Sequence, residues 1–155
     1  MTITPRQEKR AGPVDTYLSG LETFVAHGGD PATVPGIASF SLRPVDAEVD
    51  RRLEKVGGNS ALELRGLAAV AQAKLVYRLF EERFSTERWA RLARCGARPQ
   101  RQLWTFSGTD FESDHIRSYV EDLIASNTVH TLSESTVAAL TANGTRGTRA
   151  RHRHS

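Results

Sequence analysis

The sequence has one cysteine, Cys95, and no apolar run as long as a membrane-spanning helix. A single cysteine excludes an internal disulfide, and without a cluster of cysteines and histidines a structural zinc site is not expected. No membrane span is predicted, because a bilayer-crossing helix needs about 20 apolar residues. The first ten residues, MTITPRQEKR, lack the apolar stretch of a signal peptide, so a cytoplasmic location is expected by default.

Lysine is also scarce, with three in the whole chain. Lys9 lies in a polar run, Lys55 at the end of a predicted helix, and Lys74 outside the apolar stripe of another. We expect all three to be solvated. A lysine that forms a covalent bond with a substrate must lose its charge near neutral pH, which requires burial. None of the three is therefore a good candidate for a catalytic lysine.

Positive charge is concentrated at the end of the chain. The last ten residues, RGTRARHRHS, hold four arginines and no acid, and removing them takes the net charge from +3 to −1. Such a segment can bind nucleic acid nonspecifically, but no recognition fold or interleaved aromatic residues accompany it. Residues 146–155 are predicted to form a disordered basic tail, and a nucleic-acid partner is not favoured.

The remaining residues, 1–145, suit one globular α/β domain. Strands and helices are predicted to alternate, which favours parallel strands joined by helical crossovers. The predicted strands are Met1–Thr4, Ile37–Leu42, Leu103–Phe106 and Thr128–Leu132. The predicted helices are Pro13–His27, Asp46–Val56, Ser60–Phe84, Thr86–Arg94, His115–Ala125 and Ser133–Ala142.

Local signals predict where three of these helices begin. Pro13 suits the first helical position, where a missing N–H costs nothing. Asp46 is expected to cap its own helix, and Ser60 with Glu63 resembles a capping box. Trp89 and Trp104 are interpreted as core residues, and Cys95, lacking histidine and acid partners nearby in sequence, as structural.

Four segments carry a resemblance to a known family. They are IASFSLRPVDAEVDRRLEKVG, LELRGLAAVAQAKLVYRLFEE, ERWARLARCGARPQRQLW and NTVHTL. In this order and spacing they resemble the C-terminal half of actinobacterial transaldolases, up to about Gly147. The resemblance implies a partial (β/α)8 TIM barrel, roughly strands five to eight with their helices. Four such units are too few to close an eight-stranded barrel.

The resemblance also implies an activity. Transaldolases are transferases of the pentose phosphate pathway that move a dihydroxyacetone unit between sugar phosphates through a lysine Schiff base, with no metal or cofactor. The family's Schiff-base lysine and its two acids would lie before Met1. This chain is therefore expected to be truncated and inactive alone.

The resemblance implies functional roles for individual positions of this chain. Thr2 stands where the family has a threonine that helps hold the catalytic water, although a frayed terminal residue is the simpler interpretation. Ser39 stands where a serine contacts the hydroxyl end of the substrate. Ser107 begins a Ser-Gly turn of the phosphate site. Arg43 lies one residue before the family's phosphate-binding arginine, a position that Pro44 occupies here.

Other positions depart from the family pattern. Asp110 occupies a basic position of the phosphate site, where an anion would repel the phosphate. Arg43 sits one residue early, and a one-residue shift on a strand points its side chain to the other face. His130 replaces a usual asparagine and is interpreted as a plain polar substitution. A sugar-phosphate partner thus rests on the resemblance alone.

Three hypotheses remain open from the sequence. The chain is an inactive transaldolase-derived remnant, or half of a split transaldolase completed by a chain with the N-terminal half. Alternatively, it is a non-enzymatic binding protein, either a half-barrel homo-oligomer or a nucleic-acid binder acting through its tail. Open sheet edges would make an isolated half-barrel prone to association.

Overall fold

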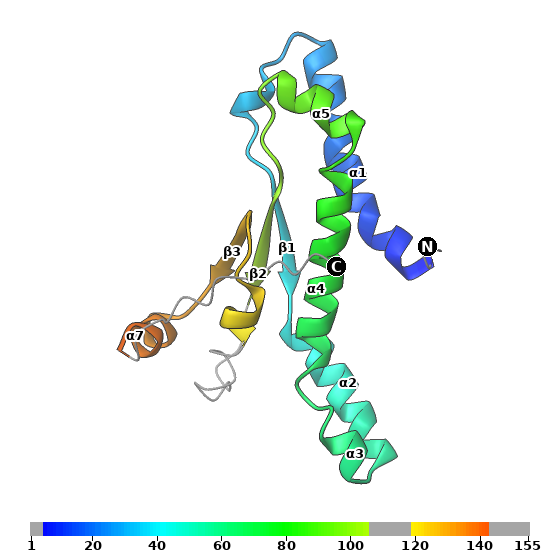
Figure 1. The fold of residues 1–155 in the computed structure, drawn as a ribbon, viewed down its shortest axis with the longest axis vertical. Helices are drawn as coiled ribbons and strands as arrows, with labels where there is room; N and C mark the ends of the chain where they lie inside the picture. Colours follow the sequence, from blue (N-terminus) through cyan, green and yellow to red (C-terminus); the bar gives the residue numbers. More distant parts are fainter. Residues whose placement is uncertain (1–4, 106–118, 143–155) are drawn as a thin grey trace, which may run out of the picture.

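A computed structural model describes residues 5–105 and 119–142, in which a parallel sheet stands beside a layer of helices (Figure 1). A further helical turn covers residues 119–123. In chain order the elements are α1 (Pro5–Ala26), η1 (Pro31–Thr33), β1 (Ile37–Ser41), α2 (Arg43–Val56), α3 (Asn59–Leu62), α4 (Ala68–Arg83), α5 (Glu87–Arg94), β2 (Arg101–Thr105), β3 (Thr128–Thr131) and α7 (Glu134–Ala142).

Within the described residues, the sheet has three parallel strands in the order β1-β2-β3. Ser39 is paired with Leu103, and Leu103 with Val129, so equivalent positions of the three strands form straight rows. The prediction of parallel strands with crossovers is confirmed for this mixed α/β arrangement. The predicted strand Met1–Thr4 lies outside the described residues, and closure into a barrel stays a prediction.

One face of the sheet packs against α4. Alternate strand residues point to the same face, and Phe40 contacts Trp104 there with ring centroids 5.8 Å apart. Trp104 is 1% exposed, which confirms its predicted place in the core. Ala69 and Ala73 of α4 are fully buried and, being small, let the helix approach the indole closely. The buried members of this cluster are Leu42, Ala69, Ala73, Trp104, Tyr119 and Leu123.

A second cluster joins α1 to α5, with Trp89 partly buried against it. The Thr86 hydroxyl accepts a hydrogen bond from the Trp89 N–H at 3.3 Å, so Thr86 caps α5, whose range is close to the predicted Thr86–Arg94. Cys95, which follows the last turn of α5, is exposed, so a structural role for it does not come from core packing. The buried members of the cluster are Val14, Leu18, Leu21, Leu92 and Ala97.

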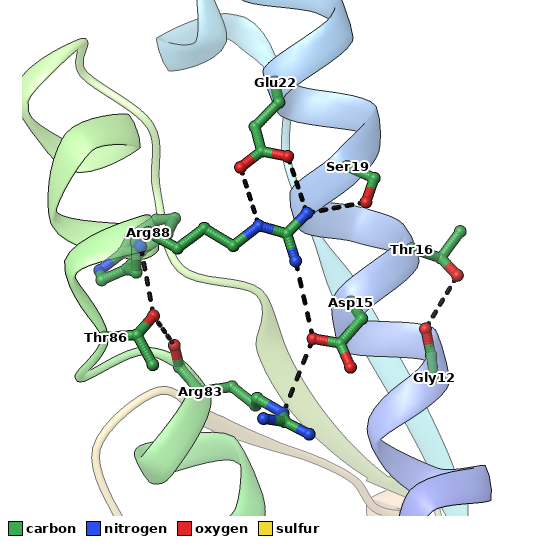
Figure 2. A network of polar contacts seen from close by, with 9 residues as sticks. Gly12, Asp15, Thr16, Ser19, Glu22, Arg83, Thr86 and Arg88 are labelled. Atoms are coloured by element: carbon green, nitrogen blue, oxygen red, sulfur yellow. Dashed lines mark hydrogen bonds and ion pairs between the residues drawn. The ribbon is translucent and has the colours of Figure 1, made fainter.

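Polar contacts reinforce the packing of α1 on α5 (Figure 2). The Arg88 guanidinium donates to both Glu22 carboxylate oxygens, at 2.8 and 2.7 Å, and to the Ser19 hydroxyl at 2.7 Å. Asp15 Oδ1 lies 3.8 Å from Arg88 and 3.6 Å from Arg83. Hydrogen bonding to Arg88 lowers the pKa of Glu22. The network therefore ties the middle of α1 to the α4–α5 junction.

Asp46 does not cap its own helix, which corrects the prediction. The position before α2 is Leu42, without a side-chain cap, and Asp46 lies buried in the first turn. Its Oδ1 accepts the Ala69 N–H at 2.8 Å, and its Oδ2 accepts the Tyr119 hydroxyl. Because the first N–H groups of a helix lack partners within it, Asp46 satisfies the start of α4 from another helix.

The predicted helix from Ser60 to Phe84 is wrong, because two helices, α3 and α4, occupy this range. Gly66 between them has φ +72°, a left-handed conformation that suits glycine. Its N–H donates to Asp50 Oδ1 at 3.0 Å, and its carbonyl lies 2.9 Å from the Tyr119 hydroxyl. The Ser60 capping box is also absent, since Gly58 precedes α3 without a side-chain cap.

Pro13 is not the first residue of its helix, because α1 begins at Pro5 and contains Pro13 in its interior. A proline inside a helix removes one backbone hydrogen bond. Residues 6–11, RQEKRA, are strong helix formers, and Gly12 separates them from Pro13. The predicted start was therefore eight residues too late.

His130 lies in the same row as Trp104 and is half-buried on the helix-facing side of the sheet. Burial disfavours the charged imidazolium and lowers the pKa of His130.

None of the described helices combines the length and apolar character needed to cross a lipid bilayer.

Removing the Tyr119 hydroxyl should destabilise the fold. Tyr119→Phe leaves the buried Asp46 carboxylate without one donor, which costs about 1–3 kcal/mol of unfolding free energy in urea denaturation. Tyr77→Phe is the matched control, because its hydroxyl donates to the Ser126 carbonyl at 3.0 Å in an exposed setting. An equal loss in both variants would contradict a special role for the Asp46 contact.

The Arg88 network should contribute about 1 kcal/mol, since its members are partly solvated. Arg88→Met is expected to lower the urea midpoint, with the loss shrinking as pH falls through the lowered pKa of Glu22. Arg94→Met is the control, because the Arg94–Glu87 pair is 2.9 Å long but 64% and 69% exposed. If the two variants lose equal stability at neutral pH, the network adds nothing beyond a surface pair.

His130 should make stability sensitive to mild acid. Because the pKa of His130 is lower in the folded chain than in the unfolded chain, the unfolded chain takes up the proton at a higher pH. The free energy of unfolding should therefore decrease as pH falls below about 6.5. His130→Gln should reduce the drop in urea midpoint between about pH 7 and pH 5. His27→Gln, on the exposed turn after α1, serves as control, and an identical pH profile for His130→Gln and the parent chain would refute the assignment.

Candidate functional site

Among the described residues, the second face of the sheet is exposed along β1 and half-buried at Leu103 and Val129. In β1, Ile37, Ser39 and Ser41 alternate with the helix-facing residues Ala38 and Phe40. Ile37 is 59% exposed, and the side chains of Ser39 and Ser41 are also exposed. Parallel sheets are normally covered on both faces. This open face is therefore the part of the described fold with surface left to engage a partner or ligand.

A row of hydroxyl side chains crosses the C-terminal edge of this face. Ser41 is paired with Thr105, and Thr105 with Thr131. All three are the last residues of their strands, and neighbouring strands lie about 4.8 Å apart. The Thr105 hydroxyl donates to the Phe40 carbonyl at 3.4 Å. In open α/β sheets ligands bind beyond the carboxyl ends of the strands, so this row marks the candidate site.

The row was not predicted from the sequence. Each residue reads individually as an ordinary polar residue at the end of a strand. The sequence did carry one indication of the row, because Ser41, Thr105 and Thr131 are each the last residue of a short strand. Their alignment depends on strand register, which no short-range pattern in the sequence specifies.

Ser39 lies on the same open face, two residues before the Ser41 end of β1 and in register with Leu103. Its predicted contact with the hydroxyl end of a substrate stays a prediction, but its side chain is exposed and lies next to the hydroxyl row. Thr2, Ser107 and Asp110 fall outside the described residues.

Arg43 is not on a strand, so the argument that its one-residue shift would turn it to the opposite face is wrong. β1 ends at Ser41, Leu42 is buried, and Arg43 is the first residue of α2. Its half-buried side chain is therefore positioned by the helix start, just beyond the C-terminal edge of the sheet.

Neither of the lysines whose side chains the structure describes is buried. The Lys74 side chain is 55% exposed and pairs with Asp122 at 3.5 Å. Lys55 is exposed at the end of α2. Within the described part of the chain, no three histidine, cysteine, aspartate or glutamate side chains gather closely enough to hold a metal ion. The described part of the open face therefore offers hydroxyl groups for hydrogen bonding.

The chain is similar in sequence to curated transaldolases. It is 45% identical over 131 residues to the transaldolase of Acidothermus cellulolyticus, which covers 84% of this chain and 35% of that protein. It is 41% identical over 145 residues to that of Thermobifida fusca, covering 94% and 39%. For that of Mycolicibacterium smegmatis the identity is 44% over 144 residues, covering 93% and 39%.

The chain thus spans a little over a third of the length of these relatives. A scan against models of protein families finds none that matches. The level of identity holds over nearly the whole chain and recurs across several actinobacterial proteins. By sequence, therefore, this chain is related over most of its length to part of the actinobacterial transaldolases.

Proposed function

We propose that the chain forms the C-terminal, substrate-contacting half of a transaldolase-type barrel. In this proposal, dihydroxyacetone transfer requires a Schiff-base lysine from a complementary segment. The observation that carries this is the 41–45% identity to transaldolases over at least 84% of the chain. The parallel sheet with one helix-covered and one open face is the arrangement expected of a barrel segment. Sugar phosphates are the substrate class that the relationship suggests.

The residues proposed to meet the substrate are those at the C-terminal edge of the open face. Ser39 would hydrogen-bond the hydroxyl end of a sugar phosphate, with Ser41 and Thr105 as further neighbours of the polyol. Arg43, just beyond the edge, would contribute positive charge near the phosphate. Thr2 and Ser107 belong to the same proposal through the family pattern, as residues of the water site and the phosphate turn.

The chemistry explains why a second segment is needed. Cleavage of the carbon–carbon bond requires an amine that forms an iminium with the ketose, because the iminium accepts the electrons of the breaking bond. Such an amine must be desolvated to be neutral near pH 7. The exposed Lys55 and Lys74 do not meet this requirement. Hydroxyl groups on the open face can bind and orient a sugar, but they cannot replace the amine.

The open face gives a second candidate some support. Ile37 is 59% exposed on it, and burying such a side chain against another copy of the sheet would be favourable. A half-barrel that associates with itself would be a binding protein without transferase activity. Light scattering on the purified chain separates a stable dimer from a monomer that awaits a different partner.

Borohydride trapping with fructose 6-phosphate tests the proposed function. The chain alone should give no covalent adduct by intact mass. Mixed with the N-terminal part of the Thermobifida fusca relative, it should give an adduct on that part, because the amine is supplied there. The same N-terminal part incubated alone is the control. An adduct on this chain would overturn the proposal, as would a mixture that yields no more adduct than the control.

A further inference from the structure

A cavity of about 190 Å³ lies between β1, α1 and α4, on the helix-covered side of the sheet. Its wall is mostly apolar, with Phe40 from the sheet, Val14 from α1, and Val76 and Phe80 from α4. Ser39 of the edge strand borders it, but the hydroxyl row at the strand ends does not contribute to its lining. The cavity is therefore distinct from the hydroxyl row at the strand ends, although Ser39 borders both.

Two of the residues that line this apolar cavity carry a buried donor without a hydrogen-bond partner among the described residues. Gln102 is 3% exposed, and its side-chain Nε2 makes no hydrogen bond to any residue that the structure describes. The Nε of Arg83 is likewise buried and makes no hydrogen bond within the described residues. Its ion-pair partner, Asp15 Oδ1, lies 3.6 Å away, beyond hydrogen-bond distance. Buried N–H groups without acceptors are unfavourable, so an acceptor that reached them would be bound favourably.

We propose that this cavity binds a small monocarboxylate with an apolar body, such as an aromatic acid. A carboxylate offers two acceptor oxygens, which matches the two buried donors, and its charge complements the Arg83 guanidinium. The apolar wall accommodates the body of the ligand. Cavities of about 150 Å³ in other proteins hold benzene, so the size suits a single ring with a carboxylate. The proposal does not depend on transaldolase activity.

Benzoate titration into the full chain tests the proposal, with calorimetry for affinity and the side-chain amide NMR signal of Gln102 for location. We expect saturable binding and a shift of that signal. Toluene, which lacks the carboxylate, should bind at least ~10-fold more weakly, because the charged hydrogen bonds are lost. This comparison needs no mutation and so does not depend on the stability of any variant.

Variants then assign the donors. Gln102→Leu and Arg83→Met should each weaken benzoate binding by ~10-fold or more. Gln100→Leu is the matched control, because Gln100 is also buried but does not line the cavity. Val76→Phe fills the cavity and should abolish binding. Circular dichroism establishes that each variant is folded, and the partly exposed Arg83 carries the test if Gln102→Leu fails to fold.

Three results would overturn the proposal. The first is no saturable benzoate binding at ~10 mM, an affinity weaker than about −3 kcal/mol, which would leave the cavity to water alone. The second is equal binding of toluene and benzoate, which would remove the role of the donors. The third is unchanged benzoate affinity in both Arg83→Met and Val76→Phe, which would place the ligand elsewhere. None of these results bears on the Schiff-base experiment.

Discussion

The buried carboxylate of Asp46 is the contact on which the packing of α2, α4 and the helical turn 119–123 depends. It accepts the Ala69 N–H at the start of α4 and the Tyr119 hydroxyl, while the same hydroxyl lies 2.9 Å from the Gly66 carbonyl. Burial, together with the bond to Asp46, raises the pKa of Tyr119, so the phenol remains a donor. One acid therefore links the helix after β1 to the helix beyond β2.

The Asp46 contact matters for the candidate site because α2, which carries Asp46, begins at the edge of the sheet where that site lies. α2 starts two residues after β1 ends, at the edge where Ser41 and Arg43 lie. The Asp46 contact fixes the first turn of α2 against the start of α4, and thereby holds the backbone that carries Arg43. A residue that touches no substrate in our proposal thus determines the shape of the edge that does. Stability and site geometry are coupled here through a single buried group.

The two faces of the sheet differ in how they are covered and in the side chains they carry. The helix-covered face is filled by Trp104 against Ala69 and Ala73, and the open face carries small hydroxyl residues and the exposed Ile37. An uncovered parallel sheet leaves apolar surface in water, which is unfavourable. The related transaldolases are more than twice as long as the matched region, and in our proposal a complementary segment covers this face. The relatives' length and the open face thus lead to the same proposal of a complementary half.

The sequence alone determined the parallel α/β arrangement, the three described strands to within two residues, helix α5, and the relationship to transaldolases. These follow from local composition and spacing, or from similarity. Only the tertiary structure decided that Asp46 caps α4 rather than its own helix and that Gly66 breaks the predicted helix. It also decided that Ser41, Thr105 and Thr131 form one row. The reason is physical, because each of these depends on partners distant in sequence, and short-range patterns carry no information about such partners.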